Sequence, residues 1–121
     1  MKLITMVFIL NATILILHEI ESAFEEEWLL FKLPGGMTGF LLFHVPLLLM
    51  AFWGVLEIEG STPVGHILSL VFGLLGLAPF FVHMLFLKVE GSYNKTISLM
   101  IIYANVVLGL VLVYISVRGI V

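Results

Sequence analysis

Four apolar stretches, separated by short polar segments, run along the chain. This pattern predicts helices over residues 3–31, 38–56, 63–87 and 95–118. The first break contains Pro34 followed by the paired Gly35 and Gly36, and Pro63 suits the first turn of the third helix. A membrane-spanning helix needs about 20 predominantly apolar residues. The expected fold is therefore all-α, a four-helix transmembrane bundle with up-and-down topology that forms a single domain over residues 1–121.

The composition agrees with a membrane protein and excludes several function classes. Hydrophobic residues make up 62% of the 121 residues and charged residues only 11%, whereas about a quarter of the residues in a soluble domain are charged. A net charge of −3 offers no basic surface, so no nucleic-acid partner is expected. The chain has no Cys, so a bound metal would need imidazole, carboxylate or amide ligands.

A His and a dense acidic cluster lie within the first predicted helix. Five of the eight acidic residues of the chain fall between His18 and Glu27, although an ionised side chain at mid-bilayer costs about 2.5 kcal/mol or more. Residues three, four and seven apart share a helix face. One polar stripe is therefore expected, made up of Asn11, His18, Glu21, Ser22 and Glu25. A solvated helix end explains Glu26, but His18 and Glu21 lie about 15 to 20 Å from the predicted end.

The other three helices bring polar residues to the same side of the membrane. Alternating topology places His44, near the start of the second helix, and His83, near the end of the third, on the side where the first helix ends. On the fourth helix, Asn105 lies about ten residues in from that side and can face the bundle interior. His66, close behind Pro63, is expected at the opposite interface. We therefore expect polar groups from all four helices to meet within one leaflet.

Several of these residues also have a purely structural interpretation. A lone intramembrane His, such as His44 or His83 taken singly, is often a hydrogen-bond partner for a neighbouring helix. Trp28 is typical of the membrane–water interface, and a contact to substrate is its second interpretation. Small residues on the face of His83 allow helices to approach closely; they are Gly65, Ser69, Gly73 and Gly76. The same stripe could instead pack against a second copy of the chain, so the formation of a homo-oligomer stays open.

Two chemistries fit this group of side chains. In the metal hypothesis, a divalent transition metal (zinc, iron or manganese) is held by imidazoles and a carboxylate. The His18–Glu21 spacing is the reverse of the Glu-x-x-His pairs that hold metals inside four-helix bundles, and Glu25 is an alternative carboxylate. In the metal-free hypothesis, a carboxyl group and a His form an acid/base pair that moves protons on an apolar substrate. The sequence leaves both open.

The end of the first helix resembles a motif of known membrane proteins. His18, Glu19, Ile20 and Glu21, then Glu27-Trp28, Phe31 and Leu33-Pro34-Gly35-Gly36, resemble the signature of a family of small, uncharacterised bacterial four-helix membrane proteins. The resemblance extends through His44 and His83, over most of the chain. A more distant similarity is to the membrane proteins named for a His-x-x-Glu-Glu motif, in which Ser22 stands here in place of the second Glu. The resemblance implies an integral protein of the bacterial inner membrane, supports the site residues, and brings no settled activity.

Three functional classes follow from these observations. We expect first a metal-dependent enzyme acting on a lipid-like or other apolar substrate, because the site lies near one leaflet and membrane lipid can reach it laterally. Its catalytic residues would be His18, Glu21, Glu25 and Glu27, its metal ligands His18, Glu21, His44 and His83, and its substrate contacts or supporting residues Glu19, Trp28 and Asn105. The second class is a proton or divalent-metal transporter or channel. The third is a metal-free acid/base isomerase or a non-enzymatic membrane subunit.

Charged residues near the helix ends bear on topology. Lys2 followed by a short apolar stretch also fits a secretory signal, but such signals do not usually carry a His and two Glu before the cleavage point. We therefore expect the segment to be retained.

Basic residues at the two ends of the bundle differ by one charge, with Lys32, Lys88 and Lys95 on the side of the site and Lys2 and Arg118 on the other. The positive-inside rule places the site toward the cytoplasm.

Overall fold

The computed structural model describes residues 1–29, 32–85 and 95–119. The elements are α1 (Leu3–Phe24), the 3-10 turn η1 (Glu27–Leu29), α2 (Gly36–Glu59), α3 (Pro63–Leu85) and α4 (Lys95–Arg118). Each α-helix is long and apolar enough to cross a membrane. The predicted all-α, four-helix fold is confirmed, and its helices fit an integral membrane protein.

The helix boundaries differ from the predicted ones chiefly at the acidic cluster. Helix α1 ends at Phe24, well before residue 31, and η1 follows after a left-handed Glu26 with φ of 54°. Three successive carboxylates beside the negative end of the helix dipole are unfavourable, which explains the early end. Helix α2 is longer than predicted, from Gly36 to Glu59. The predicted ends at residues 31 and 87 lie outside the described residues.

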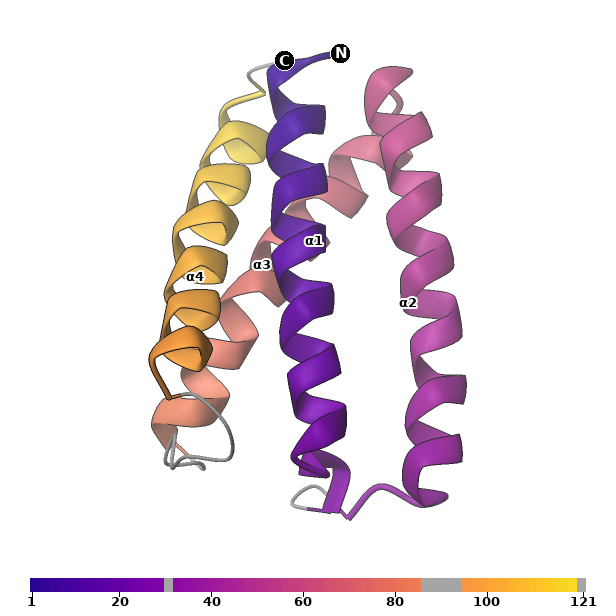
Figure 1. Ribbon diagram of the computed structural model, residues 1–121. Coiled ribbons are helices and arrows are strands. Elements are labelled where there is room, and N and C mark those ends of the chain that lie inside the picture. Colours follow the sequence, from indigo (N-terminus) through magenta and orange to yellow (C-terminus); the bar gives the residue numbers. More distant parts are fainter. Residues whose placement is uncertain (30–31, 86–94, 120–121) are drawn as a thin grey trace.

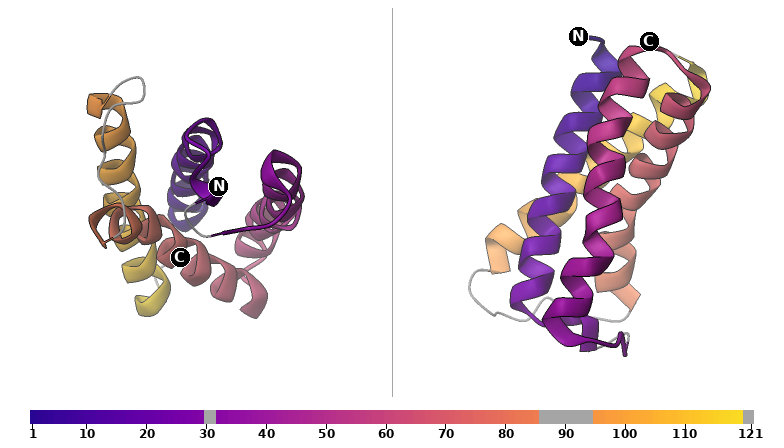
Figure 2. Two further views of the ribbon diagram at one scale, coloured as in Figure 1. Left: turned by 90° about the horizontal axis from the view of Figure 1, so that it is seen from below. Right: turned by 90° about the vertical axis from the view of Figure 1, so that its right-hand side faces the viewer.

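The four helices run alternately in opposite directions, so α1 and α3 are parallel and the two termini lie at one end of the bundle (Figure 1). Helix α4 packs on α1 and α3. Helix α2 packs against α1 and α3 and, within the described residues, has no contact with α4. It therefore stands at the side of a three-helix group, as the views along and across the bundle show (Figure 2).

All four helices contribute side chains to the buried core, with Ala51 and Ile58 from α2. The rings of Phe8 and Phe72 pack with their centroids 5.0 Å apart, and both side chains are buried. Helices α3 and α4 approach so closely at Gly73 and Gly109 that a Cβ on Gly109 would lie 2.7 Å from the carbonyl oxygen of Gly73. Such close packing is the main source of helix association in lipid, where the hydrophobic effect between helices is absent.

Two buried polar pairs tie α1, α3 and α4 together. Nδ2 of Asn105 donates to Oδ1 of Asn11 at 3.0 Å, and Nδ2 of Asn11 donates to the carbonyl oxygen of Phe72 at 2.7 Å. The hydroxyls of Ser69 and Ser116 lie 2.7 Å apart. The Asn pair fixes α1 against α3 and α4 at mid-height, and thereby sets which residues of α1 and α3 meet further along.

Candidate functional site

The parallel packing of α1 and α3 brings His18 and His83 together. Asn11 lies against Gly76, where an added Cβ would be 2.4 Å from its Oδ1. His18 and His83 follow these two residues by seven positions on each helix, about two turns, and so lie on the same two faces. Their rings meet edge to face, with centroids 5.4 Å apart.

Glu27 completes a three-residue group with these two imidazoles. One ligand atom from each of His18, Glu27 and His83 lies within 4.8 Å of the others. The side chains of His83 and Glu27 are only 8% and 11% exposed, and His18 is buried. Helix α1 ends at Phe24, and the turn that follows brings Glu27 back toward α1 and α3. A continued helix would carry Glu27 away along the helix axis.

The imidazoles of this group have ring nitrogens without hydrogen-bond partners among the described residues, and its ligand atoms lie close enough together to share an ion. Nε2 of His83 lies 3.4 Å from Oε1 of Glu27, yet neither ring nitrogen of His83 has a hydrogen-bond partner among the described residues, and the same holds for Nδ1 of His18. A buried polar group without a partner costs about 1 to 3 kcal/mol. Two ligands on a tetrahedral zinc ion, with bonds of about 2.0 to 2.1 Å, lie about 3.4 Å apart. The contact between His83 and Glu27 has this length, and all the ligand atoms of the group lie within 4.8 Å of one another.

The Glu27 carboxyl lies outside the membrane-spanning helices and its ionisation is perturbed. Burial raises the pKa of Glu27 above its ordinary value, and this effect outweighs the hydrogen bond with Ser22 and the nearby His83, which both lower the pKa. A carboxylate that is costly to ionise gains more than an exposed one from a bound cation. The electrostatics of the turn therefore agree with the spacing of the ligand atoms.

A second His/Glu pair lies beside this group. Nδ1 of His44 lies 2.7 Å from the carbonyl oxygen of Phe40, which can only accept, so Nδ1 carries a proton and donates it. Nε2 lies 2.7 Å from Oε2 of Glu19. A proton must occupy that contact as well, so the pair is either imidazolium with carboxylate or imidazole with carboxylic acid. In both forms its total charge is zero.

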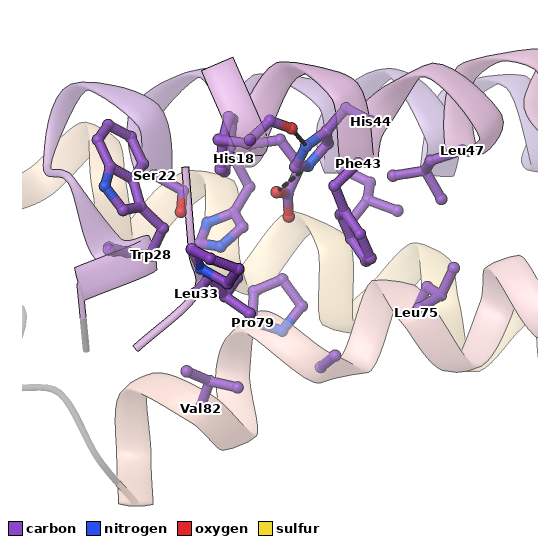
Figure 3. Close-up of a pocket in the computed structure, with 17 residues that line it drawn as sticks. His18, Ser22, Trp28, Leu33, Phe43, His44, Leu47, Leu75, Pro79 and Val82 are labelled. Carbon is purple, nitrogen blue, oxygen red and sulfur yellow. Dashed lines mark hydrogen bonds and ion pairs between the residues drawn. The ribbon is translucent and has the colours of Figure 1, made fainter. Parts of the chain in front are cut away.

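A cavity of about 430 Å³ between α1, α2 and α3 contains residues from both groups. Its polar lining consists of His18, Glu19, Ser22, Glu27 and His44. Figure 3 shows Trp28 at the end near η1, and Leu47 and Leu75 at the end toward mid-membrane. His83 does not line the cavity. The cavity thus has a polar end next to the His18–Glu27–His83 group and an apolar end deeper in the bundle.

The structure brings together only some of the residues singled out from the sequence. His18 and His83 meet as part of one group, but its carboxylate is that of Glu27, where the sequence suggested Glu21 as the ligand. His44 is not in the group, because it pairs with Glu19. Glu21 is buried and engaged in other interactions, and Glu25 has a buried Oε1 without a hydrogen-bond partner in the described part of the chain.

Other predicted residues lie further from the centre. Trp28 is buried at 7% exposure and lines the cavity, which favours the substrate-contact interpretation over a lipid-facing interfacial one. Asn105 belongs to the central Asn pair and does not line this cavity. His66 is exposed and lines a second cavity, with Ser61 and Thr62 from the loop before α3. Ser22, which belongs to the polar stripe predicted from the sequence, lines the cavity, and so does Pro79, which the sequence analysis did not single out.

The fold and the site define a class: a polytopic, all-helical membrane protein with a buried His/Glu group at one end of its bundle. The chain belongs to a family of unknown function, DUF6713, whose model matches residues 4–119. This match agrees with the expected membership of an uncharacterised family. No characterised protein and no solved structure matches the chain.

Proposed function

We propose that this protein is a metal-dependent membrane enzyme that acts on a lipid-like or other apolar molecule. A divalent transition ion, with zinc as the first choice, would be held by His18, Glu27 and His83. The observation that carries the proposal is the convergence of three ligand atoms, from the buried His18 and the partly buried Glu27 and His83, within 4.8 Å of one another. The ligand set differs from the one suggested by the sequence, because Glu27 takes the place of Glu21 and His44 is absent.

The ligand set supports a catalytic role over a purely structural one. Two His and one Glu are the ligands of several catalytic zinc sites, in which the fourth position is left for water or substrate, whereas structural zinc is bound by four protein ligands. Such an ion would supply Lewis acidity or an activated water molecule. The cavity lined by His18 and Glu27 would supply space for a substrate beside such an ion.

The protein's own residues would position a substrate and handle protons. The His44–Glu19 contact holds a proton at the wall of the cavity, within reach of a bound molecule. Trp28 shields the polar end from water, since its side chain is only 7% exposed. A location in a bacterial inner membrane, with the site toward the cytoplasm, belongs to the proposal and is supported by the motif resemblance and the Lys distribution.

Metal analysis of the purified protein tests the proposal. The protein in mild detergent is incubated with zinc, iron(II) or manganese(II), desalted, and measured by elemental analysis. We expect about one ion per chain, lost in His18→Ala and in His83→Ala. His66→Ala is the matched control, because His66 is exposed and lies at the opposite end. Folded wild-type protein that retains none of the three ions, or variants that retain as much as wild type, would refute the metal centre.

The buried polar pairs favour a second candidate, a transporter for protons or divalent ions. Asn11 with Asn105, then Ser69 with Ser116, continue the polar groups from the site toward the opposite end. There Ser116 lines a second cavity of about 240 Å³ together with His66. The candidate is tested in proteoliposomes with zinc or proton gradients. Saturable flux that disappears in His18→Ala would replace the enzyme with the transporter, and flux equal to empty vesicles would exclude it.

A further inference from the structure

The walls of the large cavity change from polar to apolar along the membrane normal. Its polar lining groups come from residues 18, 19, 22, 27 and 44. Figure 3 shows Ser22 and His18 on the side of Trp28, and Leu47 and Leu75 at the other end, toward mid-membrane. A molecule that satisfies both ends has one polar group and one apolar chain, with the chain directed into the bilayer. This is the orientation that an amphiphile already has in one leaflet.

The size of the cavity restricts this amphiphile to one chain. Ligand pockets of about 300 to 1,000 Å³ hold molecules of drug-like size, and this cavity, at about 430 Å³, lies toward the lower end of that range. Its edge reaches the outer surface of the bundle, since Phe43 and Leu33 line it and are 68% and 47% exposed. A chain can therefore enter from the surrounding lipid without crossing water.

The charges at the polar end point to an uncharged head group. Each of the two lining carboxylates already has an imidazole beside it: Glu19 lies 2.7 Å from His44 and Glu27 lies 3.4 Å from His83. No described residue that lines the cavity is Lys or Arg. In the metal-free protein, an anionic head would meet the carboxyl groups of Glu19 and Glu27, and no Lys or Arg of the lining would balance its charge. A cationic head would find each of these carboxyl groups already beside an imidazole. Burying an unpaired charge is costly.

We infer that this cavity binds a single-chain amphiphile with an uncharged, hydrogen-bonding head group, such as a long-chain alcohol, aldehyde or amide. The cavity itself is the ground for this binding, and the inference rests on the proposed function only in naming the bound molecule as the substrate. The head lies among Glu19, His44 and His18, and the chain lies between Leu47 and Leu75. For the metal-free cavity, phospholipids, fatty acids and alkylamines are excluded as preferred ligands.

Trp28 provides a built-in reporter for this binding. Trp53→Phe removes the other Trp, which lies on α2 where its Nε1 donates to Glu57, and leaves Trp28 at the polar end of the cavity. The protein, in phosphatidylcholine nanodiscs and treated with chelator, is titrated with hexadecanol brominated next to the hydroxyl. We expect saturable quenching of Trp28 that unlabelled hexadecanol reverses. The brominated hexadecanoate and hexadecylamine should bind at least about tenfold more weakly, a difference of about 1.4 kcal/mol.

A pair of variants on α3 distinguishes binding in the cavity from partitioning of the probe into the surrounding lipid. Ala78→Phe places a ring in the cavity and should abolish the saturable part, whereas Leu74→Phe, on the same helix at a 53% exposed position that does not line the cavity, should leave it unchanged. Quenching without saturation, equal quenching in both variants, or preference for the charged probes would each overturn the inference. Because the protein is metal-free in this assay, saturable binding without metal uptake would refute the proposed function alone, and metal uptake without saturable binding would refute this inference alone.

Discussion

Gly76→Ala is the most direct test of how the bundle sets the site. The added Cβ would lie 2.4 Å from Oδ1 of Asn11 and 3.2 Å from Nδ2 of Asn105. Real Cβ atoms essentially never approach closer than 3.0 Å, so the Asn11 side chain must move. It cannot swing aside freely, because it is fully buried and its own Nδ2 is held by the carbonyl oxygen of Phe72. The substitution therefore separates α3 from α1.

The expected loss of stability combines two effects. Overpacking of a well-packed interior costs about 1 to 3 kcal/mol. Loss of the Asn105–Asn11 hydrogen bond adds about 0.6 kcal/mol, the average for interhelical hydrogen bonds in membranes. Gly76→Ala should thus lower the free energy of unfolding by about 2 to 4 kcal/mol. Because His83 follows Gly76 by two turns on the same face, the displacement should also weaken metal uptake.

A double-mutant cycle with Asn11→Ala isolates the proposed clash. Reversible unfolding in detergent with increasing dodecyl sulfate, followed by circular dichroism, gives the free energy of each variant. On the Asn11→Ala background the 2.4 Å contact no longer exists, so Gly76→Ala should cost about 1 kcal/mol or less, and the coupling should exceed about 1 kcal/mol. Gly60→Ala is the control, because Gly60 has a helical φ of −74° and its Cβ would meet nothing closer than 3.4 Å.

Two results would refute this reasoning. The first is a Gly76→Ala protein as stable as wild type, which would mean that α1 and α3 do not approach as closely as described. The second is an equal cost of Gly76→Ala with and without the Asn11 side chain, which would assign the cost to some other contact. Gly60→Ala should change the stability by less than about 1 kcal/mol in either case.

Three further predictions concern the metal group. Zinc affinity is measured by competition with a chromogenic chelator. Glu27→Gln should lower this affinity at least about tenfold, because a charged ligand is lost. Glu26→Gln, at the adjacent exposed position, should bind zinc like wild type. Burial raises the pKa of Glu27, so in the metal-free protein the protonated form is favoured. Its contribution to stability is complete below the unfolded-state pKa and is lost as the pH rises through the raised one. Unfolding of the metal-free protein at a series of pH values should show this loss, and Glu27→Gln should reduce it. The His44→Ala protein should keep the full metal content. A loss of metal in this variant would show that His44 is a metal ligand.

Much of the fold could be read from the sequence because hydrocarbon imposes strict rules on the chain. Four apolar stretches of spanning length, separated by Pro, Gly and charged residues, leave few alternatives to four helices. The end of α1 could not be read in the same way. The apolar pattern continues through Trp28 and residues 29–31, and only the repulsion among Glu25, Glu26 and Glu27 near the helix end argues for the break that the structure shows.

The candidate site was only partly predictable, for a geometric reason. Alternating topology is enough to bring His18 and His83 to the same side on parallel helices. It does not show which way each side chain points. Successive helix residues are rotated by about 100°, so His18 faces His83 on α3 while Glu19 faces His44 on α2. Glu27 joins the group only because the chain leaves the helix before it, and no helical periodicity can indicate that.

Glu27 differs from its two partners in being carried by a short turn between two long helices. The helices fix the imidazoles through the whole packing of the bundle, so changing either His position means disturbing the scaffold. The η1 turn does not take part in the packing of the long helices to the same extent. The proposed metal ligand at position 27 could therefore be replaced, for example by Asp, Asn or His, without changing the helix bundle. Affinity and preference among ions could thus be tuned at one loop position, which makes the η1 segment the natural place to look for divergence between relatives and the first place to engineer.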